Sequence, residues 1–242
     1  FEGQGIGTLL MTWAEERSRQ AVGRTPQGVR VSMRSATPHT HQPGHRLLQD
    51  LGMERIRHFW DMKIEMAAPP PEPRWPDGIT LRPFNYPQDL RPVYLAFDDA
   101  FKDHWGHVDQ PVEKRLKEWR HWLDNDEEFD PALWFVVVEG DEIAGMSLCR
   151  PKTAEDPGMA WVDILGVRRP WRKRGLGLAL LHHTFGEFYR RGTRKVGLGV
   201  DAGSLTGATR LYERAGMRPM RQFDLYDKEL RPGHELGTQS AD

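Results

Sequence analysis

Residues 161–181 read WVDILGVRRPWRKRGLGLALL, an apolar run, a basic loop with glycines and a second apolar run. The first run, 161–167, is bounded by turn signals and predicts a strand inside a sheet. Pro170 ends that strand, because proline has no N–H to donate to the ladder. Gly175 and Gly177 let the backbone approach a ligand closely or take positive φ, and a helix is expected to begin there. Free N–H groups at a helix start behind a basic loop predict an anion site, and a pyrophosphate is the anion that suits it.

Two common phosphate loops do not fit this stretch. A Rossmann loop needs a third glycine near the position of Leu180, and a P-loop needs Gly-Lys-Ser/Thr after the glycines, where the chain has Leu and Ala. The spacing that remains, Arg172-x-x-Gly175-x-Gly177 after an apolar strand, resembles the acetyl-CoA loop of the GNAT acyltransferase superfamily. A solvated basic turn with glycine caps is the alternative.

The resemblance implies both the fold and the site of the co-substrate. The fold would be α+β (α/β), a GNAT fold whose central mixed, mostly antiparallel sheet is flanked by helices. Acetyl-CoA would lie with its pantetheine arm and thioester carbonyl against backbone groups at the strand end, and its pyrophosphate would be wrapped by the loop. Gly166 suits pantetheine because it is small, and a bulge is the alternative explanation for it. The residues concerned are Leu165, Gly166, Val167, Arg172, Lys173, Arg174, Gly175, Leu176 and Gly177.

A second stretch resembles the family's proton-donor segment. Residues 201–217 read DAGSLTGATRLYERAGM, similar to Asn, six residues and then Leu-Tyr-Glu-x-x-Gly-Phe. The resemblance implies that Tyr212 is catalytic and faces the CoA sulfur. A phenol with a pKa of about 10 is protonated at neutral pH and can donate to a leaving thiolate. Packing on a helix face is the alternative for Tyr212. Ser204 stands where the family usually has Asn, and it can cap the helix or bond to CoA through a weaker contact.

The proton acceptor is less well defined by the sequence. Asp163 shares a strand face with Trp161 and Leu165, and a partly desolvated carboxylate there could take a proton from the ammonium group directly or through water. A hydrogen-bonded aspartate of the sheet is the alternative. Asp103-His104-Trp105 lies in the loop between two predicted helices, where GNAT domains usually shape the acceptor pocket. His104 is a candidate base or ligand there, and a plain loop histidine is the alternative.

Composition argues against several classes of protein. The chain has 242 residues and a net charge of −1, whereas nucleic-acid binders are usually basic. No apolar run approaches the ~20 residues of a membrane span, and no signal peptide is visible in a chain that begins at Phe1 without Met. The lone Cys149 cannot form an internal disulfide, which indicates a reducing, cytoplasmic compartment. His39, His41 and His45 cluster in a loop without a Cys or an acidic neighbour, so no metal site is predicted.

A proline-rich segment, residues 69–78, is a stiff linker and the best boundary in the chain. We expect residues 1–68 to be a partial N-terminal GNAT-like unit, degenerate and truncated. Residues 79–230 are expected to form a complete GNAT acyltransferase domain, followed by a disordered tail at 231–242.

The N-terminal unit repeats the end of the second one. The glycine loop at 3–7 aligns with 173–177, and 51–53 aligns with 215–217. Leu48 stands at the position of the proton-donor tyrosine, so the first copy lacks that group. The two-unit layout resembles tandem GNAT proteins of the mycothiol synthase type, which implies packing between the two units within the chain.

The function that these features indicate is acyl-CoA-dependent N-acyl transfer. An acetyl group would pass from acetyl-CoA to a primary amine by direct attack through a tetrahedral intermediate, with a small-molecule amine as acceptor. A non-catalytic CoA-binding or interaction module and a protein N-acetyltransferase are the alternatives. The acceptor itself is not readable, because loops form the walls of its pocket.

Overall fold

The computed structural model describes residues 3–203 and 207–238 of the chain. Its strands are β1 (Val31–Pro38), β2 (Glu54–Glu65), β3 (Ile79–Arg82), β4 (Trp134–Glu139), β5 (Glu142–Arg150), β6 (Met159–Val167), β7 (Lys195–Asp201) and β8 (Arg218–Arg231). Its α-helices are α1 (Ile6–Val22), α2 (Gln42–Asp50), α3 (Leu90–Phe101), α4 (Val112–Asp124), α5 (Leu176–Arg190) and α6 (Ala208–Arg214), with 3-10 turns η1 (Pro131–Leu133) and η2 (Arg169–Trp171).

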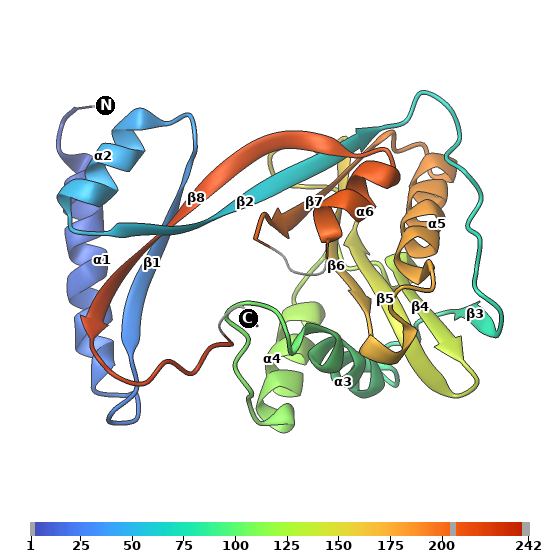
Figure 1. The fold of residues 1–242 in the computed structure, drawn as a ribbon, viewed down its shortest axis with the longest axis horizontal. Helices are drawn as coiled ribbons and strands as arrows, with labels where there is room; N and C mark the ends of the chain where they lie inside the picture. Colours follow the sequence, from blue (N-terminus) through green and yellow to red (C-terminus); the bar gives the residue numbers. More distant parts are fainter. Residues whose placement is uncertain (1–2, 204–206, 239–242) are drawn as a thin grey trace. The chain divides into compact units, whose positions relative to one another are not determined.

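The strands form one eight-stranded mixed sheet in the order β1-β8-β2-β7-β6-β5-β4-β3 (Figure 1). The pairs β1–β8, β3–β4, β4–β5 and β5–β6 are antiparallel, and β6–β7 is parallel. This sheet with its flanking helices confirms the predicted α+β fold class. The predicted order from the first strand after the linker to the last strand is confirmed as well.

The elements of the N-terminal part follow the same order as those at the C-terminal end. The series α1-β1-α2-β2 matches α5-β7-α6-β8, helix for helix and strand for strand. Both series begin on a glycine with left-handed backbone, Gly5 at φ 76° and Gly175 at φ 88°. Glycine is required there because this conformation is strained for other residues.

The chain divides into two compact units whose borders run through strands β2 and β8. Unit 1 holds residues 1–60, 201–203 and 221–237, and unit 2 holds 61–200, 204–220 and 238–242. From the sequence, the last strand is predicted to belong to the domain at 79–230. In the structure, most of that strand, β8, lies in unit 1. There β8 pairs with β1 and covers an edge that would otherwise present unpaired backbone groups.

The segment after β8 was expected to be disordered, and the structure gives it partners as far as Thr238. His234 forms a parallel bridge with Val29, and its carbonyl accepts from the Arg30 amide at 2.9 Å. The Thr238 amide donates to the carbonyl of His107 at 2.8 Å. The domain borders drawn from the sequence remain predictions.

The surroundings of β4 explain why its sequence, WFVVVE, is apolar at successive positions and does not alternate with polar residues. Trp134, Val136 and Val138 lie in the core cluster with residues of α3 and α4. Val137 faces the other way and packs with Leu180 of α5. Because helices cover both faces of this strand, apolar side chains are favoured at every position.

Helices α1 and α5 occupy equivalent places in the two series but differ in burial. In α5 the apolar face is buried, with Leu176 at 1% exposure and Leu180 at 0%. In α1 the face made by Ile6, Leu9, Leu10 and Trp13 is exposed. The described residues of unit 1 include no strands equivalent to β4, β5 and β6, against which the apolar face of α5 packs.

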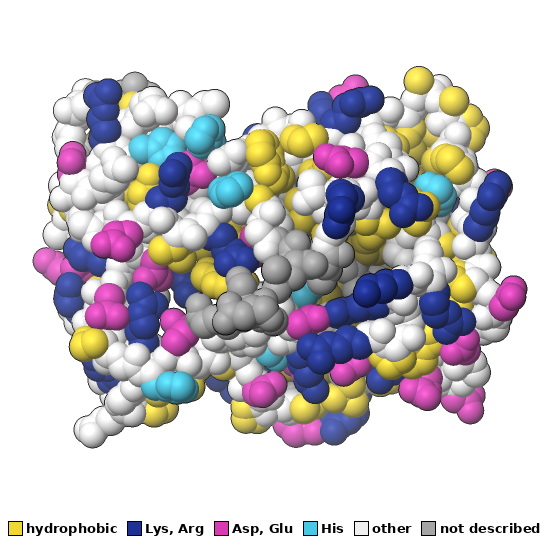
Figure 2. All heavy atoms as spheres, viewed as in Figure 1, with side chains coloured by type: hydrophobic (Ala, Val, Ile, Leu, Met, Phe, Trp, Pro, Cys, Tyr) yellow, Lys and Arg dark blue, Asp and Glu magenta, His cyan; other side chains and the backbone are white. Residues whose placement is uncertain are grey.

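Charged side chains of both signs are interspersed over the face drawn in Figure 2, in keeping with the net charge of −1. Across the described ranges, no helix is both long and apolar enough to cross a membrane.

Gly145 in β5 provides a test of the close approach between β5 and β6. A Cβ atom at Gly145 would lie 2.8 Å from the backbone oxygen of Gly166, and backbone cannot easily move away. We expect Gly145→Ala to lower the free energy of unfolding by about 1–3 kcal/mol, as overpacking does. Urea unfolding followed by circular dichroism measures this. Gly23→Ala is the control, because a Cβ at Gly23 meets nothing within 4 Å and its unfolding free energy should change by less than ~0.5 kcal/mol.

Candidate active site

Strand β6 loses its β7 partner halfway along its length. The parallel pairing runs only from Met159 opposite Lys195 to Val162 opposite Leu198. Strand β5, on the other side, stays paired as far as Val167. One edge of 163–167 therefore has no strand partner within the described part of the sheet. The predicted pantetheine contacts, Leu165, Gly166 and Val167, all lie in this stretch.

The loop after β6 presents a row of free backbone amides. Its backbone turns through Lys173, which has φ 63° although it is not glycine, and Gly175, which has φ 88°. The amides of Leu178 and Ala179 bond back to the Gly175 carbonyl, each at 3.1 Å. Within 3–203 and 207–238, no backbone hydrogen bond is made by the amides from Lys173 to Gly177. Free amides in a tight turn at the start of a helix form an anion-binding concavity.

The guanidinium of Arg172 is engaged within unit 2 instead of extending into solvent. It bonds to both oxygens of Asp103, with Nη1 at 2.5 Å and Nη2 at 3.1 Å. It also donates to the carbonyl oxygens of Ala100 at 2.8 Å and Val167 at 3.1 Å. The hydrogen bonds from Arg172 to Asp103, together with the charge of Arg172, lower the pKa of Asp103 to about 2. Arg172 was expected to wrap the pyrophosphate, and the structure directs its side chain to the end of α3 and of β6.

The other two cations of the loop differ from each other. Arg174 bonds to Glu139 at 2.7 Å and to the carbonyl of Asp77 at 3.1 Å. Glu139 also accepts from the indole N–H of Trp171 at 2.9 Å, and the bond to Arg174 is the main reason that the pKa of Glu139 is lowered. The exposed Lys173 side chain has no ion-pair or hydrogen-bond partner among the residues that the structure describes. Lys173 is therefore the loop cation best able to approach an incoming phosphate.

Two glycines of the motif are needed for packing. A Cβ at Gly166 would lie 3.1 Å from a ring carbon of Phe101, so its small size lets α3 rest on β6. The bulge offered as an alternative for Gly166 lies elsewhere, since the irregularity in β5–β6 falls at Leu148 and Cys149. A Cβ at Gly177 would lie 3.0 Å from a methyl of Leu211. Helices α5 and α6 therefore meet closely, directly beside Tyr212.

Tyr212 is buried in α6, with 8% of its surface exposed. Burial raises the pKa of its phenol to about 12, so the group stays protonated at neutral pH. Its hydroxyl has no hydrogen-bond partner within the described ranges. A protonated phenol without a partner is able to donate to a new acceptor. Ser204 lies outside the described residues, and α6 starts after Gly207.

Asp163 is paired with Arg150 on the neighbouring strand. The Nε of Arg150 lies 2.9 and 3.1 Å from its two oxygens, and Nη2 bonds to it as well. Asp163 is the main reason that the pKa of Arg150 is raised. The contact with Arg150 fixes the orientation of the Asp163 carboxylate.

The side chains of the predicted acceptor loop, Asp103-His104-Trp105, make contacts within unit 2. The ring of His104 lies against that of Phe101, with centroids 4.4 Å apart, and Trp105 is half-buried. Asp103 is held by Arg172 of the loop that follows β6. The structure therefore brings Asp103 to the loop at 172–177.

Sequence reasoning missed the partners of the charged residues at the site. Glu139 binds Arg174, and Arg150 binds Asp163. A single glutamate or arginine at the end of a strand belongs to no motif, so the sequence does not single it out. Asp99 likewise bonds to Arg168 at 2.7 Å. The only available signal was charge complementarity, and it does not identify which pairs form across the sequence.

Comparison with known proteins identifies the family. Residues 90–217 match the Acetyltransferase (GNAT) family. A mycothiol acetyltransferase of Geodermatophilus obscurus is 31% identical over 220 residues, which cover 88% of this chain and 66% of that protein. One of Salinispora arenicola is 33% identical over 230 residues, covering 88% and 69%. The chain thus spans about two thirds of the length of these curated relatives.

Solved structures agree with this assignment. A GCN5-related N-acetyltransferase from Sphaerobacter thermophilus aligns with a TM-score of 0.81 and 39% identity, covering 98% of this chain and 71% of that one. A tandem GNAT protein from the clavulanic acid biosynthesis pathway aligns with a TM-score of 0.69 over 97% and 73%, and at 16% identity it supports the fold alone. The chain belongs to the GNAT acetyltransferase family.

Proposed function

We propose that this protein transfers the acetyl group of acetyl-CoA to the primary amine of a small molecule. The observation that carries the proposal is the row of free amides from Lys173 to Gly177, which directly follows the unpaired edge of β6. The amides suit a pyrophosphate, and the edge suits an extended pantetheine arm that forms strand-like hydrogen bonds. The mycothiol acetyltransferases among its relatives support acetyl transfer as the reaction.

Binding would depend on the backbone more than on arginine side chains. Arg172 and Arg174 are occupied by carboxylates and carbonyls, so their charges are largely compensated. The amides at 173–177, the positive end of α5 and Lys173 supply the attraction for phosphate. Amides that need no rearrangement lose little entropy on binding, which favours affinity.

The chemistry is nucleophilic attack on a thioester. The lone pair of the amine forms a C–N bond with the acetyl carbon, and the tetrahedral intermediate then breaks its C–S bond. The sulfur leaves with the electron pair and takes a proton from Tyr212, while the nitrogen gives up its extra proton to a base. The Tyr212 hydroxyl suits the donor role because burial keeps it protonated and because it has no other partner in the described structure.

Asp163 remains our proposed base, acting directly or through a water molecule. Its pairing with Arg150 on the neighbouring strand holds the carboxylate in one orientation, as a positioned proton acceptor requires. His104 is the second candidate, and its contact with Phe101 places it at the end of α3. Replacing each in turn and measuring the pH dependence of kcat/KM would distinguish them, since loss of the base removes the acidic limb.

We also propose that residues 1–68 are a partial, degenerate copy of the domain at 79–230. The support is the shared order of elements and the exposed face of α1. That face occupies the positions that α5 buries against β4, β5 and β6. A helix with an apolar stripe of this kind normally packs against a sheet.

The direct test of acetyl transfer is release of CoA from acetyl-CoA in the presence of a panel of primary amines. Release that depends on the amine, with the acetylated amine detected by mass spectrometry, would support the proposal. CoA release at the same rate with and without every amine would leave only thioester hydrolysis and contradict it. Acetylation of protein amino groups in the same assay would favour the protein N-acetyltransferase alternative.

Gly175→Glu and Gly175→Gln form a matched pair for the anion site. Both carry the same strain at φ 88° and nearly the same volume, but only Glu adds a negative charge. We expect CoA affinity, measured by calorimetry, to be at least about 10-fold weaker for Glu than for Gln at low salt. The difference should shrink at 1 M salt, where charges are screened within about 3 Å. Equal affinities for the two folded variants would exclude a phosphate at this position.

Asp103→Asn tests whether Arg172 acts by holding the loop in place. If Arg172 positions the loop, loss of the carboxylate should weaken CoA binding and lower the unfolding free energy by about 1–3 kcal/mol. If Arg172 were a direct phosphate ligand, releasing it from Asp103 should strengthen CoA binding instead. Asp109→Asn is the control, because the side chain of Asp109 is 91% exposed. A double-mutant cycle that combines Asp103→Asn with Arg172→Gln measures the interaction energy between Asp103 and Arg172.

Tyr212→Phe tests the proton donor. The ring and its packing are retained, so we expect CoA affinity to change by less than about threefold while kcat falls by about 10²–10⁴-fold. Because the hydroxyl has no partner in the described structure, the unfolding free energy should hardly change. A kcat within twofold of the parent across pH 6–9 would exclude this role.

A further inference from the structure

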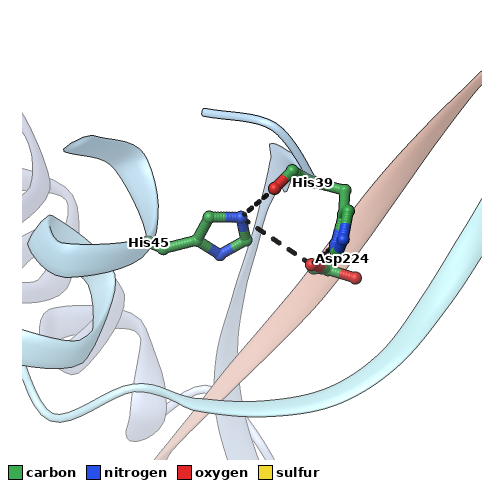
Figure 3. Close-up of side chains that lie close together, drawn as sticks. All are labelled: His39, His45 and Asp224. Atoms are coloured by element: carbon green, nitrogen blue, oxygen red, sulfur yellow. Dashed lines mark hydrogen bonds and ion pairs between the residues drawn. The ribbon is translucent and has the colours of Figure 1, made fainter. Parts of the chain in front are cut away.

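His39, His45 and Asp224 lie together in unit 1 although they are far apart in the sequence (Figure 3). His39 directly follows β1, and its amide donates to the Gln222 carbonyl at 2.9 Å. His45 comes from α2. The antiparallel register of β1 and β8 sets Thr37 opposite Asp224. The acidic partner that the histidine loop lacks in the sequence is therefore supplied by the last strand.

The separations of their ligand atoms suit a tetrahedral metal ion. The Nδ1 of His39 lies 2.8 Å from Oδ2 of Asp224, and the Nε2 of His45 lies 3.7 Å from the same oxygen. All three ligand atoms lie within 4.8 Å of one another. Tetrahedral zinc with bonds of about 2.0–2.2 Å separates its ligand atoms by about 3.4 Å. Small side-chain adjustments would bring these atoms to that geometry.

Neighbouring groups orient two of the three side chains. The Nδ1 of His45 lies 2.8 Å from the Tyr226 hydroxyl, which leaves Nε2 directed at the cluster. The Nε2 of Gln222 donates to Oδ1 of Asp224 at 2.9 Å. The Asp224 side chain is 1% exposed, and His45 is buried as well. Hydrogen bonds that fix the ring and the carboxylate from behind are typical of metal sites.

We propose that His39, His45 and Asp224 bind a divalent transition-metal ion of the zinc class, with the fourth position open to water. Two imidazole nitrogens and one carboxylate oxygen match the preference of zinc. The ion would tie the end of β1 and helix α2 to β8 within unit 1. The proposal is independent of acetyl transfer, because no residue assigned to CoA or to catalysis takes part.

Binding requires several contacts to give way, among them that of Gln222 Nε2, which lies 3.3 Å from the Nδ1 of His39. The Nε2 of His45 donates to the carbonyl of His39 at 2.9 Å, so the ring would take the other tautomer, with its proton on Nδ1 and the Tyr226 hydroxyl as acceptor, before Nε2 turns to the metal. Arg55 approaches Oδ2 of Asp224 to 3.6 Å and opposes a second cation there. The Arg55 side chain is 58% exposed, so it is able to move into solvent. The proton that His39 shares with Asp224 would leave as the metal binds.

The experiment is titration of the tag-free full chain with Zn²⁺ by calorimetry and with Co²⁺ by visible absorption. We expect one ion per chain and the intense bands of tetrahedral Co²⁺. His45→Gln and Asp224→Asn should each weaken binding by at least about 10-fold. His41→Gln is the matched control, because it removes an exposed histidine of the same loop and should leave the affinity unchanged.

Two further variants separate a metal site from a hydrogen-bond network. Tyr226→Phe keeps the buried ring and removes only the partner of His45, so it should weaken Zn²⁺ binding about 10–100-fold. Arg55→Gln should strengthen Zn²⁺ binding, since it removes a repelling charge. Equal Zn²⁺ affinity in the parent and in folded His45→Gln, or Co²⁺ spectra without tetrahedral bands, would overturn the proposal. If Asp224→Asn does not fold, His45→Gln and Tyr226→Phe decide the question.

Discussion

The guanidinium of Arg172 joins three parts of unit 2 at one point. It bonds to the Ala100 carbonyl near the end of α3, to Asp103 in the following loop and to the Val167 carbonyl at the end of β6. The loop that carries Arg172 therefore cannot move without breaking charge-assisted hydrogen bonds, each stronger than a neutral one. The amides at 173–177 directly follow this anchor in the chain, so we expect it to hold their orientation. Preorganised donors of this kind bind an anion without first having to be arranged.

This anchor changes which groups of the loop are available to a ligand. A basic loop read from the sequence has Arg172, Lys173 and Arg174 as equal contributors. In the structure the arginines are held by Asp103 and Glu139, so they shape the loop. The charge of an ion pair is largely cancelled at a distance, whereas amide dipoles at a helix start point directly at the ligand. For the proposed CoA site, we therefore expect selectivity for a pyrophosphate to come from the shape of the backbone.

Short-range sequence patterns predicted the helices and strands, but they did not predict which residues far apart in the sequence would pair. The apolar run of β4 and the glycines before α5 are short-range signals, and both elements appear where they were expected. The partners of Arg172 and Arg174 lie 69 and 35 residues away. The meeting of His39 with Asp224 spans 185 residues. Periodicity states which face of a strand is buried, but not which strand lies beside it, and the pairing of β8 with β1 follows from edge coverage instead.

Helices α1 and α5 show how the same local signal leads to different environments. Both begin on a left-handed glycine and carry an apolar face. The strands β4, β5 and β6 bury that face of α5, whereas Leu9 and Trp13 of α1 are 69% and 63% exposed. Isolated helices are marginal in water, and most of their stability comes from packing. Exposed apolar stripes of this kind mark surfaces that pack against another element, so the environment of α1, and not its own sequence pattern, distinguishes it from α5.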